Sequence, residues 1–110
     1  DFEHKLQQIL ITAIHQNDLS ITLVAKQLGL STRSLQRILK QRNTTFQIRV
    51  GNAKLAMAKS LLMDPSLSIS EIGFLLGYAE QSAFQRAFKQ WTHVSPNIFR
   101  STLTTKPIPQ

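Results

Sequence analysis

Two sets of polar side chains recur at a spacing that places each set along one stripe of a helix. The first set comprises Arg33, Gln36, Arg37 and Lys40, and the second comprises Gln81, Ser82, Gln85, Arg86 and Lys89. A stripe that only faces solvent usually mixes Glu with Lys, whereas Glu80 is the only acid beside either set. Arg pairs bidentately with guanine, and Gln with adenine, in the major groove of DNA. These residue types therefore suit the recognition of base edges.

The helices that would carry these stripes follow from apolar periodicity, which is helical along the chain and almost never strand-like. The stripes opposite the two polar sets contain Leu35, Ile38 and Leu39, and then Phe84, Ala87, Phe88 and part of Trp91. A first helix is expected from the apolar face made by Phe2, Leu6, Ile9, Leu10, Ala13 and Ile14. The sequence therefore predicts an all-α fold of about seven helices.

Capping residues indicate where these helices start. Ser or Thr precedes five of them, at Ser20, Ser31, Thr44 or Thr45, Ser68 and Ser95. Ser68 and Glu71 have the S-x-x-E spacing of a capping box, and Ser95 is followed by a proline that suits the first helical position. A long connecting helix is expected over about 45–63. Residues 101–110 show no periodicity and are expected to form a flexible tail.

Four helix ends are expected to carry a residue with positive φ: Gly29, Asn43, Gly77 and His93. Each stands one or two residues past an apolar stripe, where a left-handed residue lets the chain satisfy the last carbonyls and turn. The conformation is nearly free for glycine. At Asn43 and His93 it costs about 1 kcal/mol, which the surrounding packing must impose.

The two polar stripes belong to an internal repeat. Leu19-Ser20-Ile21 and Leu28-Gly29 recur 48 residues later, and Gln36-Arg37 and Lys40-Gln41 recur 49 residues later. Each copy, over about 20–42 and about 68–91, has the short helix, glycine-containing turn and longer helix of a helix-turn-helix. The connecting helix, at roughly 28 Å, could hold the two reading helices near one DNA turn, ~34 Å, apart. We expect one double helix-turn-helix domain over residues 1–100.

Charge supports a polyanionic partner. Thirteen Lys and Arg against six Asp and Glu give a net charge of +7. No acid occurs between Asp18 and Asp64, and none follows Glu80. Two basic stretches with a short mixed stretch between them suit a polyanion contacted twice. A basic surface without a dedicated partner is the alternative.

The chain resembles the AraC/XylS family of bacterial transcription regulators from about Leu6 to Phe99. The most specific segments are Ile72–Tyr78, Ser82–Lys89, Trp91-Thr92 and Val94–Pro96, while Ser31–Arg37 is similar to the family's first recognition helix. The resemblance implies sequence-specific binding of double-stranded DNA in the cytoplasm, at the nucleoid, with RNA polymerase as a further candidate partner. It also implies a companion domain, lacking in this chain, that binds an effector or dimerises.

The same resemblance assigns roles to single residues. Base edges in one groove would face Arg33, Gln36 and Arg37, and those in the next would face Gln81, Ser82, Gln85 and Arg86. Phosphate contacts would fall to Lys40 and Lys89, and also to Ser31, Thr32 and Lys54. Arg86 could instead turn away to pair with Glu80 or Asp64.

Three departures from the family pattern bear on these roles. Asn43 and His93 stand where glycine is usual, and both residue types tolerate a left-handed backbone. Ala79 replaces the usual Ser that caps the second recognition helix, so that helix is expected to begin loosely. Lys54 stands where Arg is usual, which keeps the charge but loses bidentate geometry.

Other functions fit the residues less well. The three histidines, His4, His15 and His93, are scattered. The chain has no cysteine, no Gly-rich phosphate loop and no paired carboxylates, so we expect neither an enzyme nor a bound cofactor or metal. A helical protein-interaction module is the alternative, but its candidate sticky residues, Met57, Trp91 and Phe99, fall at core spacing. RNA binding would favour aromatic residues on the exposed stripes, and the apolar runs fall far short of the roughly 20 residues of a membrane span.

Overall fold

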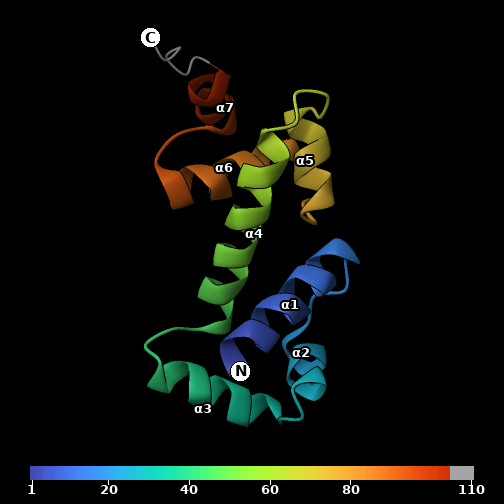
Figure 1. Ribbon diagram of the computed structural model, residues 1–110, viewed down its shortest axis with the longest axis vertical. Coiled ribbons are helices and arrows are strands. Elements are labelled where there is room, and N and C mark those ends of the chain that lie inside the picture. Colours follow the sequence, from blue (N-terminus) through green and yellow to red (C-terminus); the bar gives the residue numbers. More distant parts are fainter. Residues whose placement is uncertain (105–110) are drawn as a thin grey trace. The chain divides into compact units, whose positions relative to one another are not determined.

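Helical apolar stripes and Ser or Thr caps produce seven α-helices and no strand within residues 1–104, the part of the chain that the computed structural model describes (Figure 1). The helices are α1 (Phe2–His15), α2 (Ile21–Gln27), α3 (Thr32–Gln41), α4 (Phe46–Leu62), α5 (Ile69–Leu75), α6 (Gln81–Thr92) and α7 (Pro96–Thr104). The all-α prediction is confirmed. The chain divides into two compact units, Asp1–Ala56 and Met57–Gln110, and α4 contributes residues to both.

The first unit is built around α1, α2 and α3, with α2 packed against both of the others (Figure 1). Its fully buried side chains are 0 to 2% exposed and comprise Leu6, Leu10, Ile14, Val24, Ala25, Leu35, Leu39 and Ala53. The expected caps form, because Ser20 Oγ accepts from the Leu23 amide and Thr45 Oγ1 accepts from the Ile48 amide. Helices α2 and α3 thus make the first helix-turn-helix.

The second unit has the same plan, with α5 packed against α6 and α6 against α7 (Figure 1). Its buried side chains are Ala58, Leu62, Ile69, Ile72, Leu76, Phe84, Phe88 and Pro96. The capping box forms as expected, with Ser68 Oγ accepting from the Glu71 amide and Glu71 Oε1 accepting from the Ser68 amide. Phe88 makes edge-on ring contacts with Trp91 and Phe99. These two aromatic residues therefore take part in packing, as their spacing predicts.

All four predicted positive-φ positions are confirmed, and Asn17 at the end of α1 is a fifth that the sequence reading missed. The angles at Asn43 and His93 are 58° and 69°. The residue after Asn43 donates its amide to a carbonyl five residues back, from Thr44 N to Leu39 O at 3.0 Å. Asp18 after Asn17 makes the same bond to Ala13 O. This bond satisfies an orphan carbonyl at the helix end and requires the left-handed residue.

Replacing His93 with Val is expected to destabilise the second unit by about 1–2 kcal/mol, because a β-branched side chain fits φ of 69° poorly. His93→Gly should instead stabilise the second unit, because glycine adopts this left-handed conformation without strain. Gln90→Val, at an exposed site on α6, is the matched control and should cost roughly 0.5 kcal/mol from helix propensity alone. Urea unfolding followed by Trp91 fluorescence measures all three. Equal losses for the two Val variants would contradict the expectation.

The seventh helix is longer than expected, which corrects the boundary placed at residue 100. α7 continues to Thr104, and two of its polar side chains bond to the helix itself. Ser101 Oγ donates to Asn97 O, and Thr102 Oγ1 donates to Phe99 O. Leu103 is the only large apolar residue among positions 101–104, which is why apolar periodicity did not reveal this last turn. The rest of the tail expected at 101–110 lies outside the described residues.

Candidate nucleic-acid interface

Helix α3 presents four of the predicted site residues on one exposed stripe. Arg33, Gln36, Arg37 and Lys40 are all exposed, whereas Leu35 and Leu39 on the opposite stripe are 0% and 1% exposed. Burial of those leucines fixes the rotation of the helix, so the polar stripe faces solvent. Ser31 starts the helix, since its Oγ accepts from the Ser34 amide at 3.0 Å. Thr32, the first helical residue, is half-buried.

Helix α6 repeats this arrangement in the second unit. Gln81, Ser82, Arg86 and Lys89 are exposed, and Gln85 is half-buried. Phe84 and Phe88 anchor the opposite stripe and are both 0% exposed. The N-cap residue, Glu80, makes no side-chain capping bond. The first turn of α6 therefore lacks the side-chain cap that α3 has, and the cap position is Glu80, one residue after the Ala79 that the sequence analysis named.

The arginines on the two stripes keep their charge available. Arg33, Arg37 and Arg86 form no salt bridge with any residue in the described part of the chain. Neither Glu80 nor Asp64, the two acids that Arg86 could pair with, forms a salt bridge with it in residues 1–104. The Asp64 carboxylate instead accepts hydrogen bonds from the Ser66 amide and hydroxyl. These bonds lower the pKa of Asp64. An anionic ligand would thus meet unneutralised guanidinium groups on both helices.

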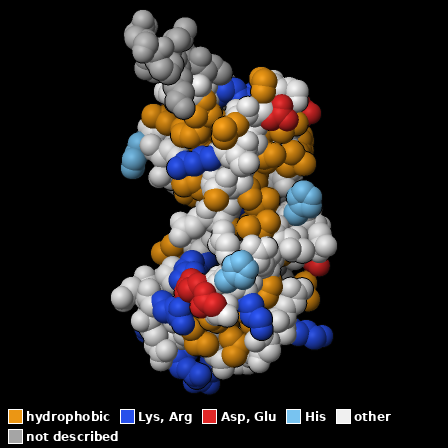
Figure 2. All heavy atoms as spheres, in the orientation of Figure 1, with side chains coloured by type: hydrophobic (Ala, Val, Ile, Leu, Met, Phe, Trp, Pro, Cys, Tyr) orange, Lys and Arg blue, Asp and Glu red, His pale blue; other side chains and the backbone are white. Residues whose placement is uncertain are grey.

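Two other arginines of the basic stretch are occupied, which the sequence reading missed. Glu3 on α1 accepts from Arg49 at 2.5 and 3.0 Å and from Arg42 at 2.6 Å. Arg42 also lies over the Phe2 ring, 4.7 Å from its centroid. Figure 2 shows an acidic side chain among Lys and Arg side chains over the first unit. The Glu3–Arg42–Arg49 cluster ties α1 to the end of α3 and the start of α4, and it lowers the positive charge offered to a partner.

Replacing Glu3 with Gln is expected to lower the melting temperature at pH 7. The hydrogen bonds from Arg49, with those from Arg42, lower the pKa of the Glu3 carboxyl to about 2. A depressed folded-state pKa gives stabilisation that is complete above the unfolded value of about 4.3. That stabilisation is lost as the pH falls toward 2. Circular-dichroism melts of both proteins should therefore converge between pH 5 and pH 2. Asp18→Asn, at an exposed acid of the same unit, is the control, and a gap that stays constant with pH would contradict the expectation.

Lys54 differs from the other predicted phosphate contacts. It lies on α4 and is half-buried, and burial lowers the pKa of its ammonium group. Lys40 and Lys89 are exposed on the two recognition stripes. Lys40 and Lys89 therefore lie on the same exposed stripes as the predicted base-reading residues, whereas Lys54 lies on the connecting helix α4.

Metal-ligand clusters and membrane-spanning helices are both absent from residues 1–104. No group of three or more His, Asp or Glu side chains there has the arrangement of a metal site. No helix there combines the length and the apolar character that crossing a bilayer requires.

Comparison with known proteins defines the class. A family model described as a helix-turn-helix domain matches residues 24–102. The solved structure of a transcriptional regulator with an AraC-type DNA-binding domain, from Chromobacterium violaceum, aligns with a TM-score of 0.79 at 25% identity, over 96% of both chains. The protein is therefore a DNA-binding helix-turn-helix domain of a transcription regulator. The chain belongs to the AraC/XylS family.

Two further relatives agree with this assignment. The C-terminal domain of AraT, a response regulator from Geobacillus stearothermophilus, is 31% identical and aligns with a TM-score of 0.78, over 97% of this chain and 87% of that one. The ornithine utilization regulator of Pseudomonas aeruginosa is 37% identical over 69% of this chain, which is 22% of the regulator's own length. The chain spans about a quarter of the length of the curated relatives it matches.

Proposed function

We propose that this domain reads a specific sequence of double-stranded DNA by inserting α3 and α6 into adjacent major grooves. Arg33, Gln36 and Arg37 contact base edges from α3. On α6 the same role belongs to Gln81, Ser82, Gln85 and Arg86. Phosphates are contacted by Lys40 and Lys89, with Ser31, Thr32 and Lys54 as supporting contacts.

One observation carries this proposal: each helix-turn-helix has an Arg and Gln stripe, exposed except for the half-buried Gln85, opposite a stripe anchored by two fully buried apolar residues. Arg and Gln are the side chains that pair bidentately with guanine and adenine. Arg37 and Arg86 occupy matching places in the repeat, each directly after a glutamine. A generic basic surface has no reason to repeat this pair at the same place in both copies.

Selection of bound sequences from a random duplex pool tests the proposal. We expect a consensus with two informative blocks about ten base pairs apart, because adjacent major-groove segments on one face lie one turn apart. A single compact block would show that one motif alone reads bases. A pool without enrichment would overturn sequence-specific recognition.

Salt titration separates this function from the alternative of a protein-interaction module. Contacts with phosphates release counterions, so DNA affinity should fall steeply and linearly in a plot of log affinity against log salt. A flat dependence would contradict phosphate contacts by Lys40 and Lys89.

The rest of the regulator belongs to the same proposal. A companion domain, outside this chain, binds an effector or dimerises and thereby controls the reader domain. RNA polymerase is the partner that such a regulator would contact at a promoter. The site of action is then the cytoplasmic nucleoid.

A further inference from the structure

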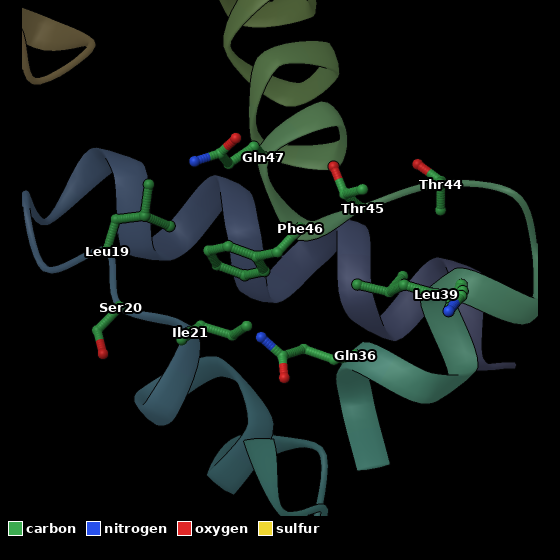
Figure 3. A pocket seen from close by; sticks show the side chains of 10 residues that line it. Leu19, Ser20, Ile21, Gln36, Leu39, Thr44, Thr45, Phe46 and Gln47 are labelled. Atoms are coloured by element: carbon green, nitrogen blue, oxygen red, sulfur yellow. The ribbon is translucent and has the colours of Figure 1, made fainter. Parts of the chain in front are cut away.

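The first unit contains a cavity of about 710 Å³ beside its recognition helix. Figure 3 shows Ile21 from α2, Gln36 and Leu39 from α3 and Phe46 from α4 pointing toward one another around it. Ligand-binding pockets measure roughly 300–1,000 Å³, are mainly apolar and carry a few polar groups. The cavity has these properties, and of its lining residues the DNA-reading scheme uses only Gln36 and Lys40.

The walls of the cavity suit an apolar body. Ile21 and Phe46 are half-buried, so part of each side chain stays accessible from the cavity. An aromatic ring of a ligand can stack on or meet the edge of the Phe46 ring.

The rim of the cavity suits a negative charge. Lys40 lines it and is exposed, and no acidic residue is among the lining residues. A carboxylate near Lys40 gains Coulomb attraction and meets no like charge. The apolar walls and the cationic rim together select an amphiphilic anion.

We propose that this cavity binds a small amphiphilic carboxylate with an aromatic or alicyclic body, and that its occupation weakens DNA binding. The apolar body lies against Ile21, Leu39 and Phe46, and the carboxylate lies near Lys40. Gln36 and Lys40 line the cavity and also belong to the DNA-reading stripe, so a bound ligand restrains or covers both. This second part rests on the proposed DNA function, whereas ligand binding itself does not.

A direct titration tests binding without DNA. The probes are 2-naphthoate and its neutral counterpart 2-naphthamide, added to the 15N-labelled chain and followed by amide chemical shifts. Saturable shifts should cluster at residues 19–21 and 36–47. The carboxylate should bind about two- to fivefold more tightly than the amide, the range expected for an exposed ion pair. Absent saturation, or shifts centred on α6, would overturn the site.

Two kinds of variant locate the ligand. Lys40→Met should remove the preference for naphthoate and leave naphthamide binding unchanged. Gln47→Trp places an indole in the cavity from an exposed lining position and should weaken both probes on the order of tenfold or more. Asn52→Trp is the matched control, since Asn52 is exposed on the same helix and does not line the cavity. Equal binding by the two Trp variants would overturn the proposed location.

Competition with DNA tests the regulatory part. Anisotropy of a labelled duplex selected by this protein should show weaker DNA binding in saturating naphthoate for the wild type and Asn52→Trp, and no change for Gln47→Trp. Saturable naphthoate binding with unchanged DNA affinity would uphold the site and overturn the antagonism. A wild-type chain that enriches no duplex would overturn the DNA function, while the amide-shift titration would still decide the ligand site.

Discussion

Truncation of Phe84 to alanine is expected to remove about 3–5 kcal/mol from the free energy of unfolding of the second unit. Phe84 is 0% exposed, and its ring lies 5.8 Å from the Tyr78 ring and 6.0 Å from the Phe88 ring. Its loss therefore opens a cavity between aromatic neighbours and forfeits their contacts. The free energy of unfolding of a small domain is only about 5–15 kcal/mol in total, so this loss would leave the second unit close to unfolded.

Collapse around the truncated site cannot easily relieve this loss. A Cβ at Gly73 would lie 3.1 Å from Phe84 Cβ, so α5 and α6 already approach more closely than an alanine at position 73 would comfortably allow. The cost of a core truncation is largest where the neighbours cannot move in. Because of the close approach at Gly73, we expect the loss of unfolding free energy for Phe84→Ala to fall in the upper part of the range of about 3–5 kcal/mol.

Phe74→Ala is the matched control, because Phe74 lies on α5 of the same unit and is 62% exposed. Its truncation should change stability by no more than about 0.5 kcal/mol. The ring centroid of Trp91, the only tryptophan, lies 6.4 Å from that of Phe88. The fluorescence of Trp91 therefore reports on the unfolding of this unit. A urea titration that gave similar losses for both variants would contradict the assignment of Phe84 as the anchor of α6.

Local sequence signals predicted the fold because they act over a few residues. The caps at Ser20, Ser31 and Ser68 each bond to an amide three residues away. The left-handed residues Asn43 and His93 close helix ends whose apolar stripes stop just before them. A cap or a helix end depends on neighbours in sequence, so one sequence is enough to reveal it.

Contacts between distant segments could not be predicted in this way. Glu3 meets Arg42 and Arg49 across separations of 39 and 46 residues, and three charged residues at those separations carry no periodic signal. The cavity lined by Ile21 and Phe46 likewise exists only because the starts of α2 and α4 lie around α3. Both features belong to tertiary packing: one pairs two arginines of the basic stretch with Glu3, and the other forms the cavity proposed as a ligand site.

Arg37→Ala and Arg86→Ala are each expected to weaken binding to the selected duplex by about 1–3 kcal/mol, or roughly five- to 150-fold. Each guanidinium is exposed on a recognition stripe and free of salt bridges with the described residues. Under the proposed function, each substitution removes a bidentate pair with a guanine, and no internal contact of the arginine compensates for it. On random duplexes, where no guanine is held in register, both variants should lose much less.

Lys40→Ala and Lys89→Ala are the matched controls, since each lysine lies three residues beyond the corresponding arginine on an exposed helix face. Loss of a phosphate contact should weaken specific and random duplexes about equally and reduce the slope of log affinity against log salt by about 1. The pattern across four variants, two duplexes and several salt concentrations separates base reading from charge attraction. If an arginine variant lost equal affinity on both duplexes, that arginine would contact phosphate. If only Arg37 showed the specific loss, base reading would belong to α3, and the less restrained first turn of α6 beside Glu80 would explain why the second stripe contributes charge alone.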